Sequence, residues 1–392
     1  MTNRKFRFGL LPRVIVAIAL GILCSMFFPD GLTRVFITFG SIFSNFLSFI
    51  IPLLILGLVA PGIAEMGRGA GKLLIITVLL AYGSTLCAGY FSYFTCQFTF
   101  PHILVPDASF AEVVLNQSND LKPFFTIEMA PIFGVMSALI LAFVLGIGIA
   151  YTDSPTLLNV LKDFRHIINL VIRNVIIPLL PLFIFAIFLE LGAEGQVSMI
   201  LKLFLKVIVV IFVIHILFLL IQFCIAGAIA RKNPIKALIT MLPAYFTALG
   251  TQSSAATIPV TLEQTRKNGV DYGISSFTVP LCATIHLAGS TLKIVACAYA
   301  IMYMLGMPIN IGLYTGFIFM LGVTMVAAPG VPGGAIMAAL AVLQQVLGFD
   351  ATLQALMIAL YITMDSFGTA CNVTGDGAIA LIVDTLYKKT VI

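Results

Sequence analysis

Long apolar runs without a single Asp, Glu, Lys or Arg recur along this sequence, and they limit most strictly what it can fold into. Residues 207–230 form one such run, VIVVIFVIHILFLLIQFCIAGAIA. About 20 residues of this kind in a helix cross the hydrocarbon core of a bilayer, and a helix also satisfies its own backbone hydrogen bonds there. Over all 392 residues only 9% are charged and 60% are hydrophobic, which excludes a soluble globular chain. We therefore predict an all-α polytopic membrane protein.

Six runs are predicted to be complete spans: about 11–28, 36–62, 72–98, 130–151, 167–192 and 198–229. The first is interpreted as a retained span and not as a signal peptide. The connections alternate in charge, since segment 100–128 is mainly acidic and the other side is basic. The basic side holds Arg4, Lys5, Arg7, Arg13, Arg68, Lys72, Lys162, Arg165, Arg231, Lys232 and Lys236. The positive-inside rule places this side, with the N-terminus, in the cytoplasm. The formal net charge of +5 is thus explained by membrane topology, and it does not indicate a nucleic-acid partner.

After residue 230 the apolar segments are shorter and are interrupted by Pro, Gly, Ser and Thr. Two interruptions stand out, TALGTQSSAATIPV at 247–260 and VAAPGVPGGAIM at 326–337. Backbone freed from helix hydrogen bonds at membrane depth must be buried in protein or line a watery cavity. We predict two re-entrant helical hairpins, at 234–272 and 312–347, with a seventh span at 276–306 and an eighth at 352–386. Broken helices of this kind are typical of secondary transporters, and the count returns the C-terminus to the cytoplasm.

The eighth span contains a polar stripe in the sequence MDSFGTACNVTGDGA, residues 364–378. Asp365, Thr369, Asn372 and Asp376 lie at i, i+4, i+7 and i+11, on one face of a helix. An ionised aspartate facing lipid costs about 3 kcal/mol or more, so this face must point into the protein. Hard oxygen ligands suit an alkali cation, a second carboxylate suits an ammonium group, and the serines of QSSAAT suit a carboxylate. The stripe thus favours a zwitterionic amino acid carried with an ion. In the structural alternative, it caps other helices or pairs with Lys293.

Other functional classes were weighed against this interpretation. The sequence shows no arrangement typical of a catalytic nucleophile, an oxidoreductase or a phosphate-binding loop, so we predict that the protein is not an enzyme and has no covalent cofactor. An ion channel or a substrate-gated receptor could use the same polar midplane, and it stays open as an alternative.

Four motifs in the last 150 or so residues resemble the dicarboxylate/amino acid:cation symporter family, which includes glutamate transporter homologues, and most of all its serine/threonine branch. They are TQSSAATIPV, VPLCATIHLAGS, GVPGGAIM and DSFGTACNVTGD, while residues 1–230 agree in span pattern. The resemblance implies an elevator-type transporter, a homotrimer embedded in the lipid of the cell (inner) membrane. Its scaffold would comprise residues 1–71 and 130–196. Its transport part would comprise residues 72–129, with the third span and outer loop, and residues 197–392.

The resemblance also implies roles for individual residues. Asp365 would hold the substrate's amino group, Thr369 and Asn372 would make further contacts, and Ser253 and Ser254 would meet its carboxylate. The gate would be formed by Gly330, Val331, Pro332 and Gly333. Sodium would be bound by Asn372 and Asp376 with seventh-span carbonyls, by Thr284 with second-hairpin backbone, and by remnants of a deep site at Tyr82 and Thr85.

Departures from the family pattern bear on the substrate and the ion. Acidic-substrate members have arginines where this chain has Gly368 and Gln252. Because a buried carboxylate without a cationic partner is costly, small neutral amino acids such as serine, threonine or alanine are favoured. The family's N-M-D-G-T appears here as His286 to Ser290, without its aspartate. We therefore expect at most two sodium ions.

His286 and Lys293 are seven residues apart and are expected on similar faces of one helix. Intramembrane ionisable residues are functional candidates by default. Either the histidine couples a proton or the lysine replaces a lost sodium; alternatively, the histidine is neutral and hydrogen-bonded and the lysine reaches toward an interface. A proton-coupled, sodium-independent carrier of amino acids or carboxylates therefore remains the alternative to sodium symport.

Overall fold

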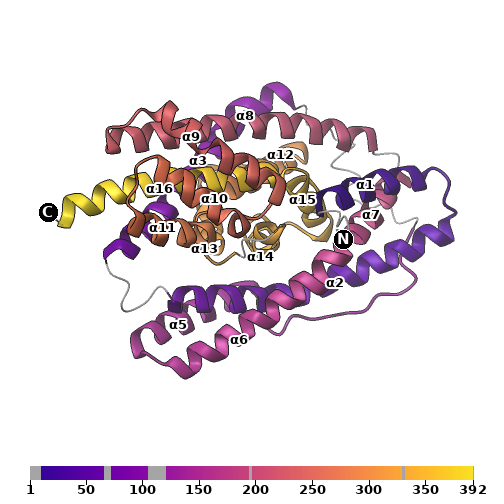
Figure 1. Cartoon of the computed structure of the whole chain (residues 1–392). Helices are drawn as coiled ribbons and strands as arrows, with labels where there is room; N and C mark the ends of the chain where they lie inside the picture. The colour runs from indigo at the N-terminus through magenta and orange to yellow at the C-terminus, as the bar shows by residue number, and fades with distance from the viewer. Residues whose placement is uncertain (1–9, 66–71, 105–120, 194–196, 329–331, 392) are drawn as a thin grey trace, which may run out of the picture.

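The computed structural model describes residues 10–65, 72–104, 121–193, 197–328 and 332–391. Apart from residues 121–134 and short connections, they form helices (Figure 1). The predicted all-helical class is confirmed for this part of the chain. In the N-terminal half the helices are α1 (Leu10–Ser25), α2 (Asp30–Glu65), α3 (Lys72–Ile103), α5 (Val135–Thr152), α6 (Pro155–Val171), a π-helical turn (Ile172–Ile176), α7 (Ile177–Ala193) and α8 (Val197–Ala230). They continue as α9 (Pro234–Thr251), α10 (Ser254–Lys267), α11 (Tyr272–Ile285), α12 (Ala288–Met304), α13 (Ile311–Ala327), α14 (Gly334–Leu347), α15 (Ala351–Thr363) and α16 (Asp365–Val391).

Five helical segments among the described residues are long and apolar enough to cross a membrane. They are Asp30–Pro61, Leu73–Ile103, Pro155–Glu190, Phe204–Ala230 and Tyr272–Met304, and the bent pair α15–α16 adds a sixth if it is one span. The first and fourth predicted spans correspond to α1 and α5, whose apolar stretches are shorter. Helix length and composition thus support a membrane protein, and the count of eight spans stays a prediction.

Each predicted hairpin contains two helices that pack against each other, α9 with α10 and α13 with α14. The first break has a local cause: Gln252 takes a left-handed conformation (φ 53°) that ends α9, and the Ser253 side chain caps α10 by accepting the N–H of Ala256. At the second break, Gly333 precedes α14 with φ 73°, a conformation that glycine adopts without steric cost. The re-entrant insertion of both hairpins stays a prediction.

The seventh span, predicted at 276–306, corresponds to the membrane-length segment Tyr272–Met304, but it is not the single helix that was expected. It consists of α11 and α12, which are separated by an extended His286 (φ −105°, ψ 92°). The cause is a side chain from another helix. Asn372 of α16 accepts the N–H groups of Gly289 and Ser290 at 2.8 and 3.3 Å, so it caps the start of α12. His286 and Lys293 therefore do not share one helix face, contrary to expectation.

The eighth span is also interrupted, since α15 and α16 meet at an angle of 63°. The bend falls at Met364, directly before Asp365, so that all four residues of the predicted stripe remain on α16. Asp365 thus lies in the first turn of a helix, at the corner of the bend.

The helices pack in two groups that touch where α2 contacts α13 and α14 and where α1 contacts α15 (Figure 1). Helices α1, α2, α5, α6 and α7 contact mainly one another. In the other group, α16 packs against α8, α9, α11 and α12, and α3 packs against α12 and α13. Residues 288–302 of α12 are buried without exception, which places the polar stripe of α16 next to the most enclosed helix of the fold.

Gly289 is where α12 approaches α16 most closely. A Cβ atom at this position would lie 2.5 Å from Cβ of Cys371 and 2.6 Å from the carbonyl oxygen of Gly368. Gly289→Ala should therefore destabilise the protein by about 1–3 kcal/mol through overpacking against backbone. The matched control is Gly316→Ala on α13, where an added Cβ meets nothing within 4 Å. Thermal unfolding of the purified variants in detergent measures both effects, and equal melting temperatures would contradict the expectation.

Candidate functional site

Asp365 joins three elements at the bend before α16. Its Oδ2 accepts the backbone N–H of Gly333 at 2.7 Å, which brings the tip of the second hairpin onto the carboxylate. Its Oδ1 lies 3.4 Å from Nζ of Lys293 on α12. Since Asp365 is 4% and Lys293 1% exposed, this is a fully buried ion pair. Both carboxylate oxygens are therefore engaged, one by the gate segment and one by a lysine.

Lys293 is held at Asp365 by two further contacts. Its ammonium donates to the carbonyl oxygen of Met364 at 3.1 Å and lies 3.7 Å from the centre of the Tyr361 ring. The lysine passes through space that Gly368 leaves free, because a Cβ there would overlap Cε and lie 2.5 Å from Nζ. The alternative in which Lys293 reaches toward an interface is wrong. The absence of a side chain at Gly368 thus leaves the space that the Lys293 side chain occupies.

Asn372 uses its whole side chain to join α16 to α12. Besides capping the start of α12, it donates through Nδ2 to Oγ of Ser290 at 3.1 Å, and Ser290 accepts the Tyr361 hydroxyl at 3.0 Å. Thr369 donates back to the carbonyl oxygen of Asp365 at 3.0 Å. These are the contacts that the structural alternative for the stripe described, and they hold the helices around the break in a fixed arrangement.

Asp376 begins a chain of buried polar side chains that was not predicted. Its Oδ1 lies 2.8 Å from Nδ1 of His286, whose Nε2 lies 3.0 Å from Oγ of Ser84 on α3. Ser84 in turn accepts Nε2 of Gln222 on α8 at 2.9 Å. A neutral histidine protonated at Nδ1 satisfies every one of these bonds, with all donors directed toward the carboxylate.

The second oxygen of Asp376 makes the site suitable for a cation. Asp376 is only 1% exposed, and its Oδ2 is buried without a hydrogen-bond partner among the described residues. Buried carboxylates in proteins are paired or coordinate a metal, and sodium prefers oxygen ligands of this type. The carbonyl groups freed at the break between α11 and α12 are also oxygen ligands. The residues present therefore fit the predicted sodium ion, which is a transported substrate.

The first hairpin reaches α16 through Gln252, which donates from Nε2 to Oγ of Ser366 at 2.9 Å. Ser254 is buried at the start of α10, and Ser253 lies one residue before it as the N-cap. The tips of both hairpins thus contact the first two residues of α16, Asp365 and Ser366. Of the predicted substrate contacts, Gly333 and Thr369 both bond to Asp365, while Ser253 and Ser254 follow Gln252 directly in the chain.

The remaining predicted residues lie elsewhere or are not described. The Thr284 side chain is exposed and donates to the carbonyl of Leu281. On α3, the Tyr82 hydroxyl donates to Phe319 and the buried Thr85 donates to Ala81. Each of these three hydroxyls donates to a backbone carbonyl oxygen, and their roles in sodium binding stay predictions. Gly330 and Val331 of the gate lie outside the described residues, whereas Pro332 is partly buried beside Gly333.

Comparison with known proteins agrees with this geometry. A family model described as the sodium:dicarboxylate symporter family matches residues 10–386. The chain belongs to that family. The serine/threonine transporter SstT of Acinetobacter baylyi is 26% identical over 99% of this chain and 100% of its own length. The same transporter from Acinetobacter baumannii is 27% identical over 96% of this chain and 97% of its own length. The predicted family and branch are thereby confirmed.

Membership of the sodium:dicarboxylate symporter family makes this protein a membrane transporter of the symporter type. Its family and its relatives are transporters and not enzymes, in agreement with the sequence prediction. Identity near 27% leaves room for local departures, and His286 of the site is one that the motifs had indicated.

Five side chains of the site were missed by sequence reasoning: Ser84, Gln222, Ser290, Tyr361 and Ser366. For one of them a signal was present. Gln222 is an amide inside a long apolar run of α8, where an isolated polar side chain in a membrane helix needs a partner. The partner, Ser84, lies between Tyr82 and Thr85 on α3 and is far away in sequence.

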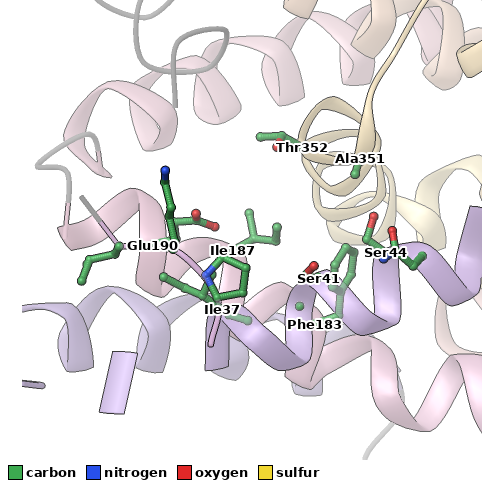
Figure 2. Close-up of a pocket in the computed structure, with 14 residues that line it drawn as sticks. Ile37, Ser41, Ser44, Phe183, Ile187, Glu190, Ala351 and Thr352 are labelled. Carbon is green, nitrogen blue, oxygen red and sulfur yellow. The ribbon is translucent and has the colours of Figure 1, made fainter. Parts of the chain in front are cut away.

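A separate cavity of about 290 Å³ lies where the two groups of helices meet. Figure 2 shows Ser41 and Ser44 of α2, Phe183 and Glu190 of α7, and the start of α15 around it. None of the predicted substrate or sodium residues lines this cavity. It therefore marks the junction between the helix groups and not the site on α16.

Proposed function

We propose that this protein is a secondary active symporter that imports a small neutral amino acid, of the serine, threonine or alanine type, together with sodium. The observation that supports it most is the contact of both hairpin tips with the start of α16, where Asp365 receives Gly333 and Ser366 receives Gln252. Broken helices around a buried carboxylate are the arrangement by which transporters bind a charged substrate at mid-membrane. The names of the two relatives agree with this substrate class.

The substrate contacts follow from the charges of the site. Asp365 is the group that would hold an ammonium, and Ser253 and Ser254 lie at a helix N-terminus, which favours a carboxylate. Thr369 and Asn372 follow on the same face of α16 and would make further contacts.

Charge balance favours a neutral side chain. The ammonium groups of Lys293 and of a bound amino acid would together balance Asp365 and the substrate's α-carboxylate. An acidic side chain would add a buried negative charge without a free partner, which is costly. The prediction made from Gly368 rested on the absence of an arginine at that position. Lys293 fills the place, and the preference now rests on the charge count, in which the lysine already balances one of the two carboxylates.

Sodium coupling would use Asp376. Its free Oδ2, the amide of Asn372 one turn earlier and the carbonyls at the α11–α12 break form an oxygen-rich region on the same face of α16. The exposed Thr284 would contribute only after a rearrangement near the second hairpin. The absence of the family's aspartate from residues 286–290 supports at most two sodium ions.

Alternating access would be of the elevator type. The packing of α1, α2, α5, α6 and α7 among themselves supports a scaffold distinct from the group around α12 and α16. In this proposal α3 belongs with the moving group, against which it packs through α12 and α13. The scaffold would assemble as a homotrimer in the cell (inner) membrane, with both termini in the cytoplasm.

The test is uptake of labelled serine, threonine and alanine into proteoliposomes under an inward sodium gradient, with aspartate and glutamate as comparison substrates. We expect saturable uptake of at least one neutral amino acid that is abolished when an ionophore dissipates the gradient. Uptake indifferent to sodium, or of acidic amino acids alone, would contradict the proposal.

One observation favours a second candidate, proton coupling. The buried pair of His286 and Asp376 places an imidazole, which can carry a proton on either ring nitrogen, against the predicted ion ligand. In this candidate a proton taken up between the two residues would replace a sodium ion. Uptake driven by an inward pH gradient in sodium-free medium would support it, and strict sodium dependence without a response to the pH gradient would exclude it.

A further inference from the structure

We infer that Lys293 acts as a built-in substitute for the substrate's amino group: it neutralises Asp365 when no amino acid is bound and so allows the second hairpin to close over the empty site. This inference rests on the proposed function, in which Asp365 holds the amino group. It goes further because it assigns Lys293 a role in the return step of the transport cycle.

The ammonium of Lys293 meets the carboxylate as a substrate ammonium would. It lies 3.4 Å from Oδ1 of Asp365, and both side chains are almost completely buried. A primary ammonium on a lysine and one on an amino acid have the same charge and the same hydrogen-bonding capacity. The lysine is thus a tethered cation in the position of the transported one.

The same carboxylate is bonded to the gate. Oδ2 of Asp365 accepts the N–H of Gly333 at 2.7 Å while Oδ1 faces the lysine. One carboxylate thus joins the second hairpin to the lysine, with each of its two oxygens taken by a different partner. Covering an ionised aspartate with protein removes it from water, which is unfavourable unless a cation balances its charge. Lys293 provides that cation.

The position of the Lys293 ammonium is fixed by its surroundings. Gly368 provides the space, the Met364 carbonyl accepts a hydrogen bond at 3.1 Å, and the ring of Tyr361 lies beneath the ammonium at 3.7 Å. The last two contacts do not involve Asp365. When a substrate ammonium takes Oδ1, the lysine can keep both of them, so that displacement needs only a short movement.

This arrangement separates two activities of a carrier. Net uptake requires the empty carrier to close and return, whereas exchange of internal for external amino acid uses only the loaded form. Without Lys293 the loaded form still has the substrate ammonium at Asp365, but the empty form has a buried, uncompensated carboxylate. Loss of the lysine should therefore slow net uptake and spare exchange.

The experiment compares Lys293→Met with the wild type in proteoliposomes, measuring net sodium-driven uptake and the exchange of labelled for unlabelled amino acid. We expect net uptake to fall by about tenfold or more while exchange stays within about threefold of wild type. Lys206→Met is the matched control, since Lys206 is exposed and donates only to the carbonyl of Ile103; both activities should be unchanged.

Gly368→Ala provides an independent perturbation, because the added Cβ would lie 2.5 Å from Nζ and force the ammonium to move without removing a charge. It should lower the ratio of net uptake to exchange in the same direction. Equal loss of both activities in the two variants, or an unchanged ratio, would overturn the inference. Failure of the proposed function would be visible separately, as a wild-type protein that shows neither uptake nor exchange.

Discussion

Asp376→Asn is expected to reduce sodium-driven uptake by about a hundredfold or more while leaving the fold intact. Asparagine has the same shape, and its carbonyl oxygen can still accept from Nδ1 of His286, which lies 2.8 Å from the aspartate. What the variant loses is the negative charge on a buried group whose second oxygen has no partner in the described part of the chain. A neutral amide is a much weaker ligand for a cation than a carboxylate.

The matched control is Asp384→Asn, two turns later on α16. Asp384 pairs with Lys388 at 2.8 Å and accepts the N–H of Asp271, and the lysine is half exposed. This variant should transport like the wild type, within about twofold, since the ammonium of Lys388 remains hydrated and the asparagine oxygen can still accept the N–H of Asp271. The measurement is initial uptake rate against sodium concentration, with melting temperature as a check of folding. Wild-type sodium dependence in Asp376→Asn would remove Asp376 from the ion site.

The sequence predicted those parts of the fold that depend on local composition. The apolar runs gave the helical membrane class, and the polar interruptions gave both helix pairs, because Gln252, Ser253 and Gly333 act through their own backbone conformation and capping. The stripe from Asp365 to Asp376 was found from helical periodicity alone, and it stays on one helix, α16.

The break in the seventh span could not be predicted in this way. The break falls at His286 and Leu287, which are neither proline nor glycine, although Pro280 and Gly289 lie on either side of it. Helix α11 ends at Ile285 because Asn372 of a distant helix caps the next one. Contacts distant in sequence also join His286 to Ser84, 202 residues away, and Lys293 to Asp365, 72 residues away. Such pairings depend on how helices meet, which periodicity in one segment does not report.

The interpretation of Gly368 shows the same limit for the site. From sequence, the glycine indicated the absence of a cation. In the structure it provides the space for Lys293, which arrives from α12. The local observation was correct, but the tertiary contact changes its meaning from an empty position to one filled by another helix.

Asp365→Asn should both abolish uptake and destabilise the protein. The variant leaves the ammonium of Lys293 buried with a carbonyl and an aromatic ring but without a counter-charge. Removing one partner of a buried ion pair costs about 3–5 kcal/mol, because the other charge stays desolvated. It also removes the group that would hold the substrate's amino group, so uptake should fall below detection. Thermal unfolding and uptake measure the two effects on the same preparation.

The double variant Asp365→Asn with Lys293→Met separates these effects. Replacing both partners removes the unpaired charge, so most of the lost stability should return, as is found when buried ion pairs are replaced together. Asparagine can still accept the N–H of Gly333, and the methionine fills the space beside Gly368. Uptake should nevertheless stay absent, because no carboxylate remains for an ammonium substrate. Recovery of uptake along with stability would mean that Asp365 serves only to balance Lys293, and the amino-group site would then have to lie elsewhere.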